Sequence, residues 1–157
     1  MASLIKISTA GAMGLHAAVY LAAQARPVCS AGAMAAELQV SEAHLVKVLQ
    51  RLTRAGLVRT GRGPKGGYAL ARPPARVRLR DVLEAVEGHL APAACLLSHK
   101  VCQGRSCILG GLVRDINRQA MLYLTAQTLG ALAGAGWPES KRPPALMKKE
   151  RQNQPKV

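Results

Sequence analysis

The residues of this chain that are best suited to chemistry are its cysteines. Cys95, Cys102 and Cys107 fall within thirteen residues, with six and four residues between them. Structural zinc prefers pairs of cysteines with about two to four residues between them, so only the second gap fits a zinc site. The thiolates of an iron–sulfur cluster can be spread around a more open loop. The spacing therefore leaves an iron–sulfur cluster, zinc and redox-active thiols open.

Two neighbouring cations, Lys100 and Arg105, favour the thiolate form of cysteine that binds metals. Cys29 is far along the chain from the other three and is predicted to be a small buried residue. A cysteine-dependent enzyme is not expected, because no histidine lies in an evident arrangement of base and orienting partner.

The second chemical feature is a run of positive charge. From Ser41 through Arg80 the chain has ten Lys or Arg residues and one acidic residue, which gives +9 of the formal net charge of +14. A surface this basic attracts a polyanion, because binding releases the counterions of the polyanion. A solvated cationic face would also explain the charge, so the elements that carry it decide between the two interpretations.

Residues 41–55 are predicted to form a helix that carries part of this charge. Ser41 is a suitable N-cap, and Gly56 stands where a helix stops. The apolar residues recur at helical spacing and are Leu45, Val48, Leu49 and Leu52. The other face is polar and basic, with Glu42, His44, Lys47, Gln50, Arg51 and Arg54. A shorter helix at 30–38 and a turn at 39–40 precede it, as in a helix-turn-helix.

A basic hairpin is predicted directly after this helix. Residues 57–60 and 68–71 are its expected strands, and the loop at 61–67 holds four glycines, one proline and two cations, Arg62 and Lys65. A helix followed by such a hairpin is the winged form of the helix-turn-helix, whose helix enters the DNA major groove. The hairpin tip would place both cations against phosphates or in a narrow minor groove.

The predicted DNA-binding residues lie on this helix and this hairpin. Residues 42–44 and Lys47 are best placed for base edges, whereas the arginines and Lys65 suit phosphates, which position a protein without specifying sequence. The predicted set is Ser41, Glu42, His44, Lys47, Arg51, Arg54, Arg59, Arg62 and Lys65.

Three further helices are predicted. The first covers residues 9–24, with Met13, Ala17, Tyr20 and Leu21 on one side, and the fourth covers residues 79–87 and ends at Gly88. Residues 108 to about 133 are predicted as one long helix that packs along another helix, either its own copy in a homodimer or the first helix of the same chain. Its apolar stripe consists of Leu109, Leu112, Val113, Ile116, Ala120, Tyr123 and Leu124.

Size and composition predict a mainly α fold with a small β-hairpin wing. The chain has 157 residues, 49% of them hydrophobic and only 3% aromatic, which suits close-packed helices. The expected parts are a winged helix-turn-helix DNA-binding domain at 1–88, a cysteine-bearing loop at 89–107, a dimerisation helix at 108–136 and a disordered basic tail at 137–157. No run of about eighteen apolar residues and no signal peptide are evident, so a cytoplasmic protein without a membrane segment is expected.

Several groups of residues match a known family. They are Ser41, His44, Leu45, Leu49 and Leu52 on the helix, residues 55–58, the hairpin residues Arg62, Gly63, Gly66, Gly67, Tyr68 and 70–72, and residues 81–83 and 85–88. Together with the three-cysteine loop before a long helix, they make residues 4–134 similar to the bacterial winged-helix iron–sulfur transcriptional regulators of the IscR, NsrR and CymR type.

This resemblance implies a homodimer in which each protomer presents one helix and one wing to half of a double-stranded DNA operator. It also implies that Cys95, Cys102 and Cys107 bind a 2Fe–2S or 4Fe–4S cluster whose state changes the affinity for DNA.

The fourth ligand of such a cluster departs from the family pattern. Gly110 stands where one branch of the family has a histidine, and Ala12 or a neighbour stands where another has an acidic residue. His99 within the loop is the candidate fourth ligand, with His89, Asp115, a small exogenous thiol or water as alternatives.

The expected function is a sequence-specific DNA-binding transcriptional repressor whose iron–sulfur cluster senses iron, redox state or nitric oxide. One alternative is a winged-helix DNA binder with a zinc or thiol-redox switch. Another is an architectural DNA-binding protein without a sensor, which would show little sequence preference and a steep dependence on salt.

Overall fold

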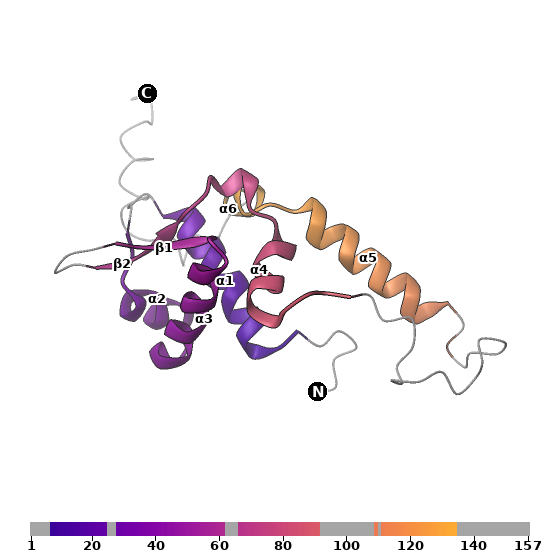
Figure 1. The fold of residues 1–157 in the computed structure, drawn as a ribbon, viewed down its shortest axis with the longest axis horizontal. Helices are drawn as coiled ribbons and strands as arrows, with labels where there is room; N and C mark the ends of the chain where they lie inside the picture. Colours follow the sequence, from indigo (N-terminus) through magenta and orange to yellow (C-terminus); the bar gives the residue numbers. More distant parts are fainter. Residues whose placement is uncertain (1–6, 25–27, 62–65, 92–108, 110, 135–157) are drawn as a thin grey trace, which may run out of the picture.

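The computed structural model describes residues 7–24, 28–61, 66–91, 109 and 111–134. In chain order the described elements are α1 (Thr9–Ala23), α2 (Ala31–Leu38), α3 (Glu42–Arg54), β1 (Val58–Gly61), β2 (Gly67–Leu70), the short 3-10 helix η1 (Pro74–Arg76), α4 (Leu79–Glu87), α5 (Leu112–Ala126) and α6 (Leu129–Gly134). The predicted fold class, mainly α with a small hairpin, is confirmed. Figure 1 shows α5 extending away from a body formed by the other elements.

Helix α1 is at the centre of this body and packs against α3, α4 and α6. It begins after Ser8, whose hydroxyl accepts a hydrogen bond from the backbone N–H of Gly11 at 3.0 Å. The predicted side of α1 is buried, and no member of the group Met13, Ala17, Tyr20 and Leu21 is more than 9% exposed. The core is completed by fully buried aliphatic side chains of the other helices, namely Leu45, Leu49, Leu52, Val82 and Leu129.

Two glycines of α1 allow α4 to approach it closely. A Cβ added to Gly14 would lie 2.9 Å from Cγ2 of Val86, and a Cβ added to Gly11 would overlap the carboxylate of Glu87. That carboxylate accepts hydrogen bonds from the backbone N–H of Ser8 at 3.1 Å and from the Ser8 hydroxyl at 2.9 Å. The last turn of α4 therefore lies directly against the start of α1.

The helix-turn-helix is formed by α2 and α3, and Gln39 makes the turn between them. Gln39 has a φ of 55°, which is the left-handed region. The N–H groups of Gln39 and Val40 bond the carbonyls of Ala36 and Ala35 at 3.3 and 3.0 Å. This is a Schellman ending, in which the left-handed residue is usually glycine. The chain makes the predicted turn without that glycine.

Strands β1 and β2 form the predicted antiparallel hairpin, in a register that puts Gly61 opposite Gly67. Cys29 pairs with Tyr68 through two backbone hydrogen bonds of 2.9 and 2.8 Å. A Cβ added to Gly67 would collide with the carbonyl oxygen of Cys29, so this glycine is required by the close approach of the two segments. Cys29 itself is 8% exposed and belongs to the core, as predicted.

The prediction of one helix from residue 108 to about 133 is wrong, because α5 ends at Ala126 and α6 begins at Leu129. The break follows from pairing with the segment before α4. The N–H of Leu79 bonds the carbonyl of Gln127 at 3.1 Å, and the N–H of Leu129 bonds the carbonyl of Val77 at 2.9 Å. Leu129 is then fully buried, so the C-terminal end of α5 is anchored beside the start of α4.

None of the residues of helix α5 is buried, and Leu124 near its C-terminal end is half-buried against the core. Leu112, Leu122 and Tyr123 are 54%, 64% and 55% exposed. Helix α6, rather than α5, makes the extensive contact with α1, so the apolar stripe of α5 is not covered by the first helix. None of the helices in the described ranges is long and apolar enough to cross a membrane.

Candidate nucleic-acid interface

Helix α3 presents two different faces. Its buried face consists of the predicted apolar residues Leu45, Val48, Leu49 and Leu52, none of which is more than 3% exposed. Its exposed residues include all of the predicted DNA-binding positions at this helix, namely Ser41, Glu42, His44, Lys47, Arg51 and Arg54. Because the core fixes the first face, the second face is held toward solvent.

The N-terminal turn of α3 is suited to an anion. Ser41 occupies the N-cap position as predicted, but its hydroxyl makes no capping hydrogen bond. The N–H groups of a first helical turn lack intrahelical acceptors and favour a negatively charged ligand. The carboxylate of Glu42 lies beside α2, since a Cβ added to Gly32 would be 3.3 Å from its Oε2. Ala43 and His44 are exposed on the same turn.

The C-terminal end of α3 leads the chain directly into β1. Gly56 has a φ of 68°, and the N–H groups of Gly56 and Leu57 each bond a carbonyl of the last turn at 3.0 Å. This Schellman ending confirms the predicted helix stop. Leu57 is only 4% exposed, whereas Arg59 on β1 is exposed. The turn therefore places the side chain of Arg59 on the surface close to the end of α3.

Arg72 belongs to this basic surface, and the sequence prediction omits it. Arg72 is exposed just after β2, and its Nη2 would lie 3.6 Å from a Cβ added to Gly56. The hairpin register brings it there, because the N–H of Ala71 bonds the carbonyl of Leu57 at 2.9 Å. The two predicted cations of the hairpin tip, Arg62 and Lys65, lie outside the described residues.

Arg51 makes a contact that the sequence does not predict. Its Nη1 donates a hydrogen bond of 2.9 Å to the backbone carbonyl of Val86, in the last turn of α4. Carbonyls in a last turn lack intrahelical donors, so the guanidinium satisfies one of them at the negative end of the helix dipole. Arg54, three residues further along α3, is exposed. Two arginines that are predicted to act alike therefore have different surroundings.

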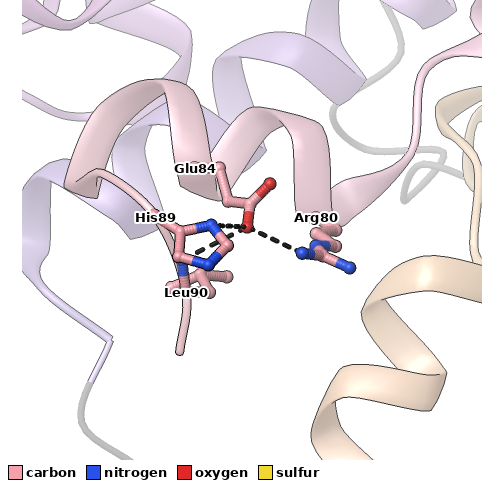
Figure 2. A network of polar contacts seen from close by, with 4 residues as sticks. All are labelled: Arg80, Glu84, His89 and Leu90. Carbon is pink, nitrogen blue, oxygen red and sulfur yellow. Dashed lines mark hydrogen bonds and ion pairs between the residues drawn. The ribbon is translucent and has the colours of Figure 1, made fainter. Parts of the chain in front are cut away.

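A polar network closes the end of α4, as Figure 2 shows. Oε1 of Glu84 accepts hydrogen bonds from Nη2 of Arg80 at 3.0 Å and from the N–H of Leu90 at 3.2 Å, and Nδ1 of His89 lies 3.2 Å from the same oxygen. The hydrogen bond from Arg80 lowers the pKa of Glu84 below its ordinary value and outweighs the opposing effect of burial. The network holds the residues that follow α4 against its last turn.

Outside the described residues lie the predicted metal ligands Cys95, Cys102 and Cys107 and the candidate His99. The structure describes the ends of this segment, which are the last turn of α4 and the start of α5. Of the alternative fourth ligands, His89 lies beside Glu84, and Asp115 is 3.7 Å from Arg118. Within the described ranges, no three His, Cys, Asp or Glu side chains gather as metal ligands would.

Comparison with known sequences points to one family. Residues 7–135 match the Rrf2 family, described as iron-dependent transcriptional regulators. The chain is 37% identical to BadM of Rhodopseudomonas palustris, named as an HTH-type transcriptional regulator, over 121 residues that cover 76% of this chain and 75% of that protein. It is also 37% identical to the HTH-type transcriptional regulator IscR of Cereibacter sphaeroides over 86 residues, which are 53% of this chain and 56% of that protein.

Solved structures of winged-helix regulators have the same fold. CymR, the global cysteine regulator of B. subtilis, gives a TM-score of 0.71 at 28% identity and covers 85% of this chain and 99% of its own. The oxidized form of Staphylococcus aureus CymR gives a TM-score of 0.65 at 29% identity and covers 82% of this chain and 96% of its own. IscR of T. potens gives a TM-score of 0.64 at 25% identity and covers 98% of this chain and 95% of its own.

Proposed function

Because this chain belongs to the Rrf2 family of transcriptional regulators, we propose that it is a sequence-specific DNA-binding repressor whose affinity for its operator is set by an iron–sulfur cluster. Members of this family are regulators and not enzymes, in agreement with the sequence prediction. The observation that carries the DNA-binding part is the exposed face of α3, which is polar and basic and continues to Arg59 and Arg72.

The exposed residues of α3 divide into two roles. Residues 43–44 and Lys47 lie on the first turns of the helix and would face base edges in the major groove. The hydroxyl of Ser41 and the N–H groups of the first turn suit a phosphate. Arg54 and Arg59 would contact further phosphates, which fix the position of the protein on the duplex.

The exposed apolar residues of α5 support a homodimer. An isolated helix of this length is marginally stable in water, and most helices gain their stability by packing an apolar face. A second copy would cover that face in α5. The dimer would also place two α3 helices on two half-sites about one turn of DNA apart. This arrangement explains why α5 stands away from the body in Figure 1.

Cys95, Cys102 and Cys107 would hold the cluster, with His99 as the candidate fourth ligand. The fit rests on donor chemistry, since three thiols lie within thirteen residues and the cations Lys100 and Arg105 favour their thiolate forms. A bound iron–sulfur cluster supplies a redox-active group whose potential depends on its ligands and surroundings.

The position of the cysteines in the chain suggests how they influence DNA binding. They fall between α4 and α5, and the last turn of α4 contacts α3 through Arg51. A change in this turn would therefore reach the reading helix. Coupling free energies between two sites are typically about 1–3 kcal/mol, which changes affinity by roughly five- to 150-fold.

Anaerobic purification followed by DNA-binding measurements tests this function. A duplex selected from a random library by the wild-type protein serves as the operator. We expect iron and sulfide in the protein, a visible absorption band, and different operator affinities for the cluster-bound and cluster-free forms. Equal affinities of the two forms would remove the control by the cluster and leave the DNA-binding function standing.

A thiol redox switch is the second candidate function. The similarity to CymR favours it, because one CymR structure of this fold is of an oxidized form. Such a switch predicts a colourless protein whose operator affinity changes with an oxidant and recovers with a reductant. A zinc site predicts a colourless protein that contains zinc.

A further inference from the structure

We propose that Arg51 is a positioning residue for DNA reading, which fixes α3 to the last turn of α4 and does not neutralise a DNA phosphate. The proposal rests on the proposed role of α3 as the reading helix. It assigns Arg51 a role different from that of Arg54, although both arginines lie on the same helix and are exposed.

The hydrogen bond that carries this assignment joins two distant parts of the chain. Arg51 and Val86 are 35 residues apart, and the bond between Nη1 and the carbonyl oxygen is partly buried. The carbonyl belongs to a residue that is held firmly, since the side chain of Val86 is 5% exposed and lies against Gly14 of α1. Through this bond the exposed edge of α3 is tied to the core.

The last turn of α4 contacts three separate segments. Glu84 binds the N–H of Leu90, Val86 binds Arg51, and Glu87 binds the N–H of Ser8 at the start of α1. Arg51 is thus the residue through which the proposed DNA-reading helix, α3, is joined to this junction. Because Nη1 of Arg51 donates to this carbonyl, the guanidinium is directed toward α4. A phosphate contact would need it to be directed toward the duplex.

The salt dependence of binding separates these two roles. Each phosphate neutralised by a side chain adds about 0.9 to the slope of log affinity against log salt concentration. Arg54→Gln, a matched change on the same helix, should lower that slope by about 1.8, because the change is present in both protomers of the proposed dimer, and should weaken binding to all duplexes similarly. Arg51→Gln should leave the slope unchanged and lower the affinity for the selected operator by roughly tenfold, which lies within the range typical of coupling between two sites.

The experiment measures fluorescence anisotropy of a labelled operator, selected from a random library, and of a scrambled duplex of equal length and composition. We expect Arg51→Gln to reduce the preference for the operator over the scrambled duplex. Arg51→Lys, which retains a donor, should recover part of that preference. Hydrogen exchange of the free protein supplies a readout without DNA, in which residues 88–90 exchange faster in Arg51→Gln and not in Arg54→Gln.

Two results would overturn the assignment. One is a slope for Arg51→Gln that falls by about 1.8, as for Arg54→Gln. The other is an unchanged operator preference together with unchanged exchange at residues 88–90. If Arg51→Gln does not fold, Arg51→Met, which also removes the charge and every donor, takes its place, and a reduced slope, or an unaltered preference together with an unaltered exchange pattern, in that variant has the same meaning. A wild-type protein that binds no duplex would instead remove the proposed function, and this inference with it.

Discussion

One carboxylate oxygen of Glu84 contacts three groups at the end of α4, which are the guanidinium of Arg80, the imidazole of His89 and the backbone N–H of Leu90. The Glu84 side chain is 25% exposed, so solvent screens these contacts only in part. Because Arg80 lowers the pKa of Glu84 in the folded protein, folding favours the carboxylate form. This contribution to stability is complete above the pKa of the unfolded chain and is lost as the pH falls through the folded-state pKa.

Replacing Glu84 with Gln should lower the free energy of unfolding at pH 7 by about 0.5–1 kcal/mol, as for a partly exposed ion pair. The difference from wild type should shrink as the pH falls through the lowered folded-state pKa of Glu84, because the wild-type carboxylate becomes protonated there. Urea unfolding followed by circular dichroism at several pH values measures this difference in the free energy of unfolding. Glu37→Gln on α2 is the control, and a Glu84→Gln penalty that stays constant as the pH falls until the wild type unfolds in acid would contradict the argument.

Cys102 is the central member of the three predicted thiolate ligands. Replacing it with Ala should abolish the visible absorption of the anaerobically purified protein and reduce its iron content, because a cluster needs its thiolate ligands. Cys29→Ala is the matched control, since Cys29 is buried in the core and should leave the spectrum intact. An unchanged spectrum in Cys102→Ala would remove that residue from the ligand set.

The exposed residues of α3 could be predicted from sequence because the helical period of Leu45, Val48, Leu49 and Leu52 decides which side faces the core. The partner of Arg51 could not be predicted, since it depends on how α3 crosses α4, far away in the sequence. The place of Arg72 depends on the hairpin register in the same way. The ligand roles of the cysteines stay predictions, because these residues lie outside the described ranges.

At the scale of elements, the turn between α2 and α3 contains a strained residue. A left-handed conformation costs a residue other than glycine about 1–2 kcal/mol. Glycine at the same position relieves this cost but loses about 0.5–1 kcal/mol through the greater freedom of the unfolded chain. Gln39 is the only described residue other than glycine with a positive φ.

Gln39→Gly should therefore raise the free energy of unfolding by roughly 0.5–1 kcal/mol and the melting temperature by a few degrees. Thermal unfolding followed by circular dichroism measures the change. Gln50→Gly is the matched control, because the same substitution inside α3 should destabilise the protein by about 1 kcal/mol. Destabilisation by Gln39→Gly would show that the side chain of Gln39 contributes more than its backbone conformation costs.

The bounds of α4 agree with the prediction, and those of α1 differ from it by one residue at the C-terminal end. Local signals fix such ends, as Gly88 shows with its φ of 91°. The break between α5 and α6 has no such signal, because apolar residues continue at helical spacing through it. It arises from backbone pairing of residues 127–129 with residues 77–79, which only the assembled fold brings together.

At the scale of the whole molecule, the arrangement of α5 bears on the oligomeric state. The C-terminal end of α5 is anchored by the buried Leu129, and the rest of the helix extends from the body (Figure 1). Leu112 and Tyr123 are separated by three helical turns and so lie on one side of α5, both more than half exposed. A single copy leaves this side in water, and two copies can cover it.

Replacing both Leu112 and Tyr123 with Glu should therefore convert a dimer into monomers, because a charged side chain in an apolar interface loses its hydration. Light scattering after size-exclusion chromatography should give the wild type twice the 16.6 kDa mass of one chain and should give the variant the mass of one chain. The affinity for the operator should fall in the monomeric variant, since binding at one half-site no longer holds a second protomer near the other half-site. Arg114→Glu lies on the opposite side of α5 and should remain dimeric. A wild-type protein that is monomeric at micromolar concentration would leave the exposed side of α5 without this explanation.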